Sequence, residues 1–336
     1  MIGSQKDLAA KLGISQMTVS RVLRGEDGVS PRLRTQIVAL AQEAGFLVPE
    51  FRQRGKNART QVVCAMVSVT HPADRSDFQT RLLQGILNGG RELGCEVMNF
   101  PEKWRGQWPL LVNRRQVDGV VHVFGGDPAS RPPRTCPIPH VSVFCPIDEV
   151  SDWITVNDAD ASRAIGEYLV RMGHRRVAFV GPTSSLAQER LMGLTFGLQQ
   201  GGGRLEPANI HMAKHASRDS VVSQLDTLIP PGTTPANLRR RFTVIAFYND
   251  DMALTGIAHL RSRGFRVPDD ISVTGFDGTT TAIGRDFQLM TAAMPLENIG
   301  VEAMRMLYWR LDYPTSPVRR LMLTAPLVEG DTVRPA

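Results

Sequence analysis

A short stretch near the amino terminus combines side chains that can read the edges of DNA bases. Gln16 and Met17 open the stretch, and Arg21 follows about one helical turn later. A glutamine can pair bidentately with adenine, an arginine can pair bidentately with guanine, and a methionine can contact the methyl group of thymine. The chemistry that these three residues offer is direct readout in a major groove.

A second set of side chains is spread over the rest of the chain, and each member follows an apolar run that predicts a strand. The set comprises Asp77, Phe78, Arg190, Asn249, Asp250 and Asp277. In doubly wound α/β sheets, ligands bind at the carboxyl ends of the strands. Carboxylates, an amide and a guanidinium group can hold hydroxyl groups bidentately. The second set therefore predicts a site for a small polyhydroxylated molecule.

Other roles compete for three members of the second set. Asn249 or Asp250 can cap the helix predicted after them, so we expect one of the two to cap and the other to bind. Asp277 precedes Gly278 and has the alternative role of a turn residue.

Three short helices would position the first set. The stretches 5–12, 16–24 and 31–44 carry apolar residues at helical spacing. The serines that can cap them are Ser4, Ser15 and Ser30. A short turn at Gly13 between the first two helices is typical of a helix-turn-helix, whose second helix enters the major groove.

The same part of the chain holds most of the net positive charge. The 336 residues include 39 Lys or Arg and 33 Asp or Glu, for a net charge of +6. Residues 1–60 hold ten basic and five acidic side chains, a net of +5, whereas residues 61–336 hold 29 and 28, a net of +1. A small basic head on a near-neutral body indicates a module for a polyanion joined to a separate globular part.

From residue 61 onward the apolar pattern predicts alternating strands and helices. Strands are expected at 62–69, 95–100, 119–124, 138–144, 176–180, near 210, and at 243–247, 271–274, 289–293 and 320–325. Helices are expected at 77–93, around 108–115, and at 158–172, 186–200, 217–228, 250–262 and 295–311. Repeated β-α-β order of this kind predicts an α/β core of two doubly wound parallel-sheet lobes with a ligand cleft between them.

Composition and motifs argue against several other classes of protein. Hydrophobic content of 42% indicates a folded chain. No apolar run approaches the roughly 18 residues of a membrane helix, and the first residues lack the apolar core of a signal peptide, so we expect a cytoplasmic protein without a membrane partner. The four cysteines are far apart, which argues against a zinc knuckle or a disulfide framework. Common catalytic and nucleotide-binding motifs are missing, so we expect neither an enzyme nor a cofactor or metal.

Five segments, in order along the chain, carry a more specific pattern. They are KDLAAKLGISQMTVSRVLRG followed by VSPRLRTQIVALAQEAGF, then 172–179, 190–194, 249–253 and 267–277. Together they resemble the lactose-repressor/galactose-repressor (LacI/GalR) family of bacterial transcription regulators, over almost the whole chain. The resemblance implies a repressor that forms a homodimer or a higher oligomer and binds near-palindromic, double-stranded operator DNA and a small-molecule effector.

The resemblance also implies a domain organisation. The helix-turn-helix DNA-binding domain would span 1–47, and a hinge or linker would span 48–60. Residues 61–336 would form a periplasmic-binding-protein-like core for effector binding and dimerisation. Its N-lobe would comprise about 61–157 and 294–322, and its C-lobe about 158–293 and 323–336.

In the head, the resemblance assigns Gln16 and Met17 to discrimination between operators. Thr18, Ser20 and Arg34 would contact phosphates or the groove and set the register. The alternative for Met17 is packing against the first helix, and the alternative for Arg21 is a solvated surface charge. The full set of expected DNA contacts is Ser4, Ser15, Gln16, Met17, Thr18, Ser20, Arg21, Arg24, Ser30, Arg34, Arg52 and Arg54.

The chain departs from the family pattern at two places, one at the end of the second head helix and one in the hinge. Arg24 stands where the family often has Asn, and 46–55 has no leucine at the place of the wedge that the family inserts into the minor groove. Phe51 is the alternative wedge. Gly55 weakens a helix by about 1 kcal/mol relative to Ala. We therefore expect a less ordered hinge helix, with diffuse attraction of phosphates by the basic linker.

In the core, the resemblance makes Arg190, Asn249 and Asp277 effector contacts. Phe144 stands where many sugar-responsive members have Asp, so it can stack on a ring but removes an acceptor for a hydroxyl group. His215 lies near the usual place of an aromatic platform, with an exposed surface histidine as the alternative. The expected effector contacts are Asp77, Phe78, Phe144, Arg190, His215, Asn249 and Asp277. These differences argue against a simple hexose and leave a nucleoside, a modified sugar or another small polar metabolite open.

The sequence thus predicts a sequence-specific transcriptional regulator, a repressor, whose operator affinity changes allosterically when a sugar-like or nucleoside-like effector binds between the lobes. Two other classes remain as alternatives: a stand-alone solute-binding protein, and an α/β enzyme on the same fold. Steep loss of DNA binding with salt would separate the regulator from both.

Overall fold

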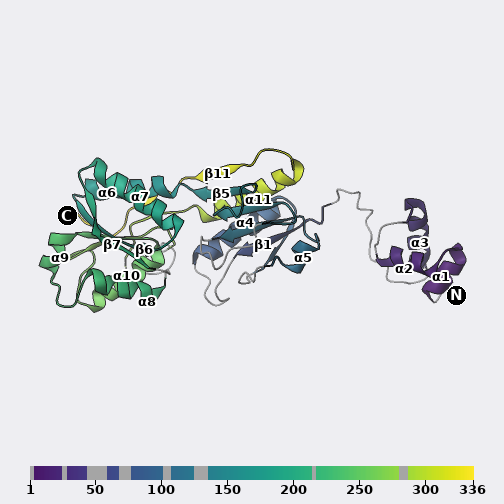
Figure 1. Cartoon of the computed structure of the whole chain (residues 1–336), viewed down its shortest axis with the longest axis horizontal. Coiled ribbons are helices and arrows are strands. Elements are labelled where there is room, and N and C mark those ends of the chain that lie inside the picture. The colour runs from purple at the N-terminus through teal and green to yellow at the C-terminus, as the bar shows by residue number, and fades with distance from the viewer. Residues whose placement is uncertain are drawn as a thin grey trace. The chain divides into compact units, whose positions relative to one another are not determined.

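The chain divides into two compact units, Met1–Arg59 and Thr60–Ala336 (Figure 1). We describe them from a computed structural model, which covers residues 4–24, 29–43, 59–67, 77–100, 107–124, 135–213, 217–279 and 287–336. Each unit has its own hydrophobic core.

The first unit holds the three predicted helices, α1 (Gln5–Leu12), α2 (Gln16–Arg24) and α3 (Pro31–Glu43). Six apolar side chains from all three helices form its buried core: Leu8, Ala9, Val19, Val22, Ile37 and Ala41. Gly13 ends α1 with a φ of 65°, a left-handed conformation that glycine adopts without steric cost. The tight turn there lets α2 follow α1 almost at once, so the helix-turn-helix prediction is confirmed.

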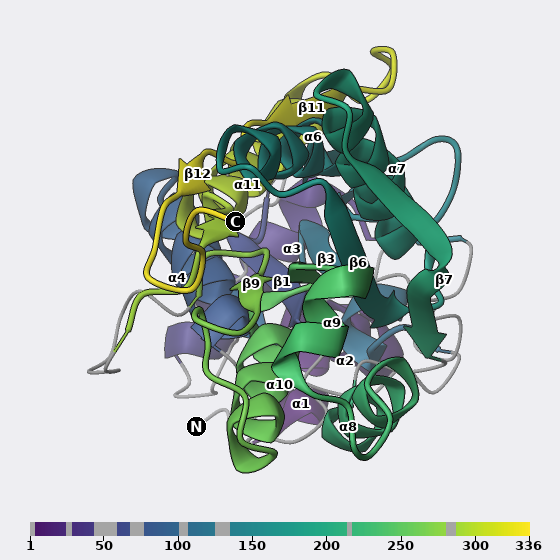
Figure 2. The ribbon, with the colours of Figure 1, turned by 90° about the vertical axis from the view of Figure 1, so that its left-hand side faces the viewer.

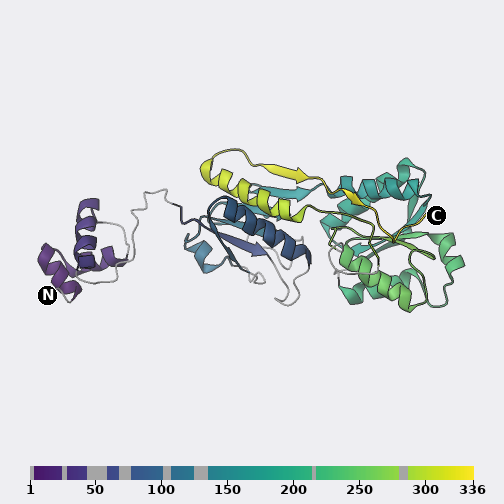
Figure 3. The same cartoon turned by 180° about the vertical axis from the view of Figure 1, so that it is seen from behind.

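The second unit begins with a parallel sheet of six strands in the order β11-β5-β4-β3-β1-β2. The strands are β1 (Val62–Val67), β2 (Glu96–Asn99), β3 (Gly119–Phe124), β4 (His140–Phe144), β5 (Asp152–Val156) and β11 (Arg320–Leu323). The helices of this layer are α4 (Asp77–Glu92), α5 (Leu110–Asn113) and α11 (Leu296–Asp312). We call this layer the N-lobe. Figure 3 shows α4 and α11 side by side along the sheet.

A second parallel sheet, of four strands in the order β7-β6-β8-β9, forms the C-lobe. Its strands are β6 (Arg176–Pro182), β7 (Arg204–Ala213), β8 (Val244–Phe247) and β9 (Ser272–Thr274). Its helices are α6 (Asp158–Arg171), α7 (Ser185–Gln200), α8 (Arg218–Leu228), α9 (Pro235–Arg241) and α10 (Asp250–Ser262). A short antiparallel pair, β10 (Thr291–Ala292) and β12 (Leu327–Val328), lies beside it.

Alternation along β6 shows why helices cover both faces of the C-lobe sheet. Val177 and Phe179 belong to the cluster that includes α6 and α7, whereas Ala178 and Val180 belong to the cluster of α8, α9 and α10. Successive side chains of a strand point to opposite faces, so a strand that is apolar at every position needs a helix layer on each side. Figure 2 shows these two helix layers above and below the strands. The predicted doubly wound lobes are therefore confirmed.

Four elements differ from the sequence prediction. Strand β5 and helix α9 were not expected, nor was the two-residue strand β12, and β7 is ten residues long rather than a short strand near Ile210. The run in β5 is only five residues long and begins with Asp152, a residue type that is depleted in strands, so its strand signal is weak. Helix α9 has only seven residues and starts at a Thr-Pro pair, a cap signal that the prediction overlooked.

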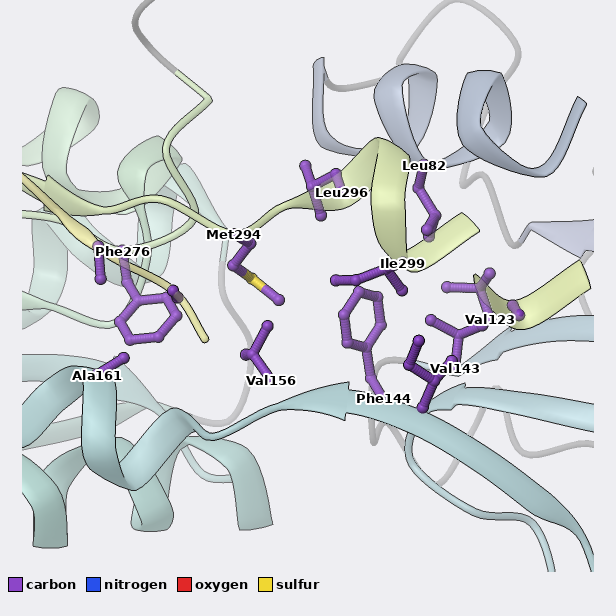
Figure 4. Packing of buried hydrophobic residues seen from close by; sticks show 14 of the residues in the cluster. Leu82, Val123, Val143, Phe144, Val156, Ala161, Phe276, Met294, Leu296 and Ile299 are labelled. Atoms are coloured by element: carbon purple, nitrogen blue, oxygen red, sulfur yellow. The ribbon is translucent and has the colours of Figure 1, made fainter. Parts of the chain in front are cut away.

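The two lobes share one continuous apolar cluster where the chain crosses between them. Val156, Met294 and Ala325 stand at the three crossings and are almost fully buried. Figure 4 shows Met294 and Val156 between Phe276 of the C-lobe and Phe144 of the N-lobe. The crossings are thus packed segments rather than loose linkers.

Helices α4 and α11 touch at the level of their backbones. A Cβ atom added to Gly85 would lie 2.1 Å from the carbonyl oxygen of Glu297, and one added to Gly300 would lie 2.5 Å from the amide nitrogen of Ile86. No side chain larger than hydrogen fits at these two positions without moving a helix. The two helices therefore behave as one rigid pair.

Replacing Gly85 with alanine tests this close approach. An alanine inside a helix normally stabilises it by up to about 1 kcal/mol relative to glycine, but Gly85→Ala should destabilise the chain by about 1–3 kcal/mol through overpacking. Urea unfolding followed by circular dichroism measures the change. Thr80→Ala, at an exposed position of the same helix, is the control and should change stability by less than about 0.5 kcal/mol. Equal stability of the two variants would show that α4 and α11 can move apart.

Candidate functional site

The exposed face of α2 carries the side chains that the sequence assigned to base readout. Met17 is 67% exposed, and Gln16 and Arg21 are also exposed. Val19 and Val22 from the same helix are fully buried. The alternative in which Met17 packs against the first helix is therefore wrong, and its apolar side chain is presented to solvent.

The three serines act as caps of the head helices. Ser4 Oγ accepts a hydrogen bond from the Asp7 amide at 3.2 Å, and Ser15 Oγ accepts one from the Thr18 amide at 3.1 Å. Ser30 Oγ lies 3.4 Å from the Leu33 amide. Helix amino termini carry partial positive charge and attract phosphate groups, so the caps hold three such ends in place.

Several expected DNA contacts lie outside what the structure describes. Arg52, Arg54 and Phe51 belong to the undescribed stretch 44–58, and the side chain of Arg24 is undescribed as well. Thr18, Ser20 and Arg34 are placed on α2 and α3 and are half-buried. The roles of all these residues, and the weak hinge, stay predictions.

The core holds a buried charged cluster around Arg190 of α7, which is only 5% exposed. Arg190 Nε donates to Asp158 Oδ1 at 2.6 Å, and Nη1 donates to the Tyr248 carbonyl at 2.7 Å and to Asp277 Oδ1 at 3.3 Å. The guanidinium plane also lies over the rings of Phe276 and Tyr248, at 3.7 and 4.4 Å from their centroids. Four elements, α6, α7 and the ends of β8 and β9, meet at this one cation.

In this cluster, burial and the neighbouring charges raise the pKa values, so the protonated forms, which donate hydrogen bonds, are favoured. Burial disfavours the charged form of Arg190, but Asp158, the Tyr248 phenol and Asp277 outweigh it and keep the pKa of the guanidinium raised. Burial raises the pKa of Asp277 well above its usual value, although Arg190 opposes the shift. Burial likewise raises the pKa of Asp250 to about 6, and hydrogen bonds from Thr291 and Thr279 reduce the shift. Two carboxyl groups, Asp158 and Asp277, therefore bond one buried cation, and the carboxyl group of Asp250 lies close enough to Asp277 to raise its pKa further.

The competition between Asn249 and Asp250 is resolved in favour of Asn249 as the cap. Asn249 Oδ1 accepts a hydrogen bond from the Met252 amide at 3.0 Å, at the start of α10. Asp250 is fully buried and accepts from the Thr279 amide at 2.7 Å and from Thr291 Oγ1 at 2.7 Å. Asp250 therefore fastens the loop after Asp277 to α10.

Asp277 is more than a turn residue. Its φ of 111° is unusual for a non-glycine residue, and its side chain belongs to the Arg190 cluster. Its amide donates to the Ala292 carbonyl at 2.9 Å, and its carbonyl accepts from the Met294 amide at 3.0 Å. Asp277 thus ties the cluster to the segment that crosses into the N-lobe.

On the N-lobe side, Phe78 and Phe144 lie together, with ring centroids 5.3 Å apart. Phe144 is only 6% exposed and belongs to the main core, with a φ of 71° at the end of β4. Asp77 Oδ2 is buried and finds no hydrogen-bond partner among the described residues. Burial raises the pKa of Tyr248, Arg190 opposes the shift, and Asp277, Asp158 and Cys145 add to it.

The structure therefore brings the predicted effector residues together in part. Arg190 and Asp277 meet directly, as do Phe78 and Phe144. His215 lies outside the described residues. The sequence reasoning missed Asp158, Tyr248 and Phe276, of which Asp158 had a signal: an acidic residue after an Asn cap at the start of a strong helix.

The described ranges also bear on metal binding and on membrane insertion. Within them no three His, Cys, Asp or Glu side chains gather in a way that could hold a metal ion. No described helix is long and apolar enough to cross a membrane.

Replacing Arg190 with a neutral residue should lower the stability of the core, because Asp158 and Asp277 stay buried. Arg190→Met should destabilise the core by about 3 kcal/mol or more, because it leaves carboxylates buried without a cation. Asp277, whose folded pKa is already raised, should then bind a proton in the folded state at a pH where the unfolded chain does not. The loss should therefore be larger at pH 8 than at pH 5. Urea unfolding at both pH values measures it.

A matched control is Arg163→Met on α6. Arg163 bonds Asp160 and Glu167 at the surface, so its replacement should leave the stability close to that of the wild type at either pH. An Arg190→Met chain as stable as this control at pH 8 would contradict the account of the cluster.

Comparison with known proteins agrees with both units. Residues 4–48 match the family model "Bacterial regulatory proteins, lacI family", and residues 167–333 match the "Periplasmic binding protein-like domain". The HTH-type transcriptional repressor CytR of Escherichia coli (strain K12) is 26% identical over 321 residues, which cover 90% of this chain and 88% of that protein.

Two solved structures share the fold over nearly the whole chain. The complex of the transcriptional regulator CelR with cellobiose has a TM-score of 0.67 at 24% identity and covers 98% of this chain and 100% of that one. The lac repressor dimer bound to operator and the anti-inducer ONPF has a TM-score of 0.63 at 20% identity and covers 99% of each chain. With a lacI-type head and a periplasmic-binding-protein-like core in one chain, this protein belongs to the lacI family of bacterial regulatory proteins and is a DNA-binding regulator of transcription.

Proposed function

We propose that the chain is a repressor whose affinity for its operator is set by a small polar metabolite bound at the Arg190 cluster. The observation that carries the proposal is the presence, in one chain, of an exposed readout face on α2 and a buried polar cluster next to a lobe crossing. A ligand that contacts both lobes prefers one arrangement of them and thereby shifts the equilibrium between DNA-binding states.

The composition of the cluster supports an effector rich in hydrogen-bond donors. Asp158 and Asp277 offer acceptors beside a single guanidinium group. On the N-lobe, Asp77 has a buried carboxylate oxygen without a partner among the described residues. Phe144 contributes no acceptor where a simple hexose would need one. A modified sugar or a nucleoside, with hydroxyl groups on one side and a less polar part on the other, fits this balance better.

In the head, Gln16, Met17 and Arg21 would read bases, and Thr18, Ser20 and Arg34 would fix the register on phosphates. A homodimer would place two such heads on the halves of a near-palindromic operator. A chromosomal target places the protein in the cytoplasm. The relatives compared above are regulators of transcription, which argues against an enzymatic role.

A matched pair of glutamines tests the readout face. The operator is first selected from random duplexes with the full chain. Gln16→Ala should weaken binding to it by about 1–3 kcal/mol and relax the preference at one base pair, because a bidentate contact is lost. Gln36→Ala, at an exposed position of α3, should change neither. Fluorescence anisotropy on operator variants measures both, and an unchanged base preference in Gln16→Ala would contradict the assignment.

A thermal-shift screen of nucleosides and modified sugars tests the sensor. A compound that binds only the folded chain at 100 times its Kd stabilises it by about 2.7 kcal/mol, which raises the melting temperature. The shift should vanish in Arg190→Met and persist in Arg163→Met. If the same compound shifts Arg190→Met as much as the wild type, the effector binds elsewhere.

A further inference from the structure

Arg81 of α4 makes a contact that joins the two lobes and belongs to neither candidate site. Arg81 Nε and Nη2 donate to the two carboxylate oxygens of Glu297, at 2.7 and 2.9 Å. Arg81 Nη1 donates to the carbonyl oxygen of Gly278 at 3.1 Å. Arg81 and Glu297 are N-lobe residues, whereas Gly278 belongs to the C-lobe and directly follows Asp277 of the Arg190 cluster.

The two ends of this contact lie on either side of one lobe crossing. Gly278 is held on the C-lobe side, because Asp277 is bonded through its backbone to Ala292 and Met294. Glu297 lies in the first turn of α11, on the N-lobe side. The guanidinium group therefore bridges the chain at the point where Met294 passes from one lobe to the other.

The N-lobe end of the bridge is rigid. Gly85 and Gly300 bring α4 and α11 into backbone contact, so Arg81 and its partner Glu297 move together. The bidentate pair fixes the orientation of the guanidinium plane and aims the remaining nitrogen at Gly278. A change in the angle between the lobes must therefore stretch the bond to Gly278 before it stretches the ion pair.

We propose that Arg81 is a positioning residue that holds the Asp277–Thr279 loop against the N-lobe and so restrains the lobe crossing at Met294. The ion pair itself is partly exposed, with side chains 29% and 40% exposed, and such pairs add little to global stability. The effect of the Arg81 contacts is instead confined to the loop that carries Asp277. The loop that carries Asp277 is held from one side by Asp250 of the C-lobe and from the other by Arg81 of the N-lobe.

This inference deepens the proposed function, because a loop held from both lobes is a route by which an occupant of the Arg190 cluster would change the lobe angle. An effector that moves Asp277 toward itself would strain or break the hydrogen bond from Arg81 to the carbonyl oxygen of Gly278. Lysine at position 81 would keep the charge but could not hold both Glu297 oxygens and Gly278 at once, since it lacks the planar fork.

Hydrogen exchange of the full chain, without DNA or any metabolite, tests the inference. In Arg81→Met the amides of Asp277, Thr279 and Met294 should exchange about three to ten times faster than in the wild type, the effect of one lost hydrogen bond on local opening. Exchange in β6 and β8 and the melting temperature should stay close to wild type. Arg81→Lys should behave like Arg81→Met.

The control is Arg163→Met, which removes an arginine that also bonds two carboxylates, both of them on its own helix, α6. Its exchange at Asp277, Thr279 and Met294 should equal that of the wild type. Wild-type exchange in Arg81→Met, or faster exchange spread evenly over the core, would overturn the inference, as would full rescue by lysine. Because no ligand is used, failure here leaves the proposed effector site untouched, and failure of the metabolite screen leaves this result untouched.

Discussion

The organisation of the core depends on one buried cation. The Arg190 guanidinium contacts the rings of Phe276 and Tyr248 and bonds two carboxylates and a backbone carbonyl. A charge buried to this extent is tolerated only with complete pairing, so α6, α7 and the ends of β8 and β9 must keep their mutual positions. The same constraint makes the cluster responsive, since any polar ligand that competes for Asp277 alters partners on several elements at once.

Most helices and strands of the fold could be predicted from the sequence, and each wrong prediction has a physical reason. Periodicity and glycine stops predicted nearly every helix, because amphipathic runs such as α4 and α6 are long and strongly patterned. Parallel strand order followed from alternation with helices. Strand β5 was missed because it is only five residues long and begins with an aspartate, and α9 was missed because a seven-residue helix gives little periodic signal.

The site was predictable at the level of strand ends but not of partners. Arg190 and Asp277 were named because both follow strands, and they do meet. Asp158 pairs with Arg190 across 32 positions of sequence, and spacing along the chain carries no information about such a pair. Phe144 was assigned to ring stacking from its position, yet its side chain lies in the packed core beside Phe78 and Ile299 (Figure 4).

Allosteric control in such a chain requires that a small displacement of the residues around Arg190 is transmitted to the N-lobe. It must not be lost in local deformation of the segments that connect the lobes. Loose crossings would absorb it, but Val156, Met294 and Ala325 are packed in the shared apolar cluster. Close-packed interiors deform little, so motion is channelled into rotation of whole lobes. Asp277 stands where the polar cluster, the crossing at Met294 and the loop facing Arg81 meet. Its side chain bonds Arg190, its backbone bonds Met294, and its neighbour Gly278 accepts a hydrogen bond from Arg81. Binding energy at Asp277 can therefore be converted into a change of lobe angle.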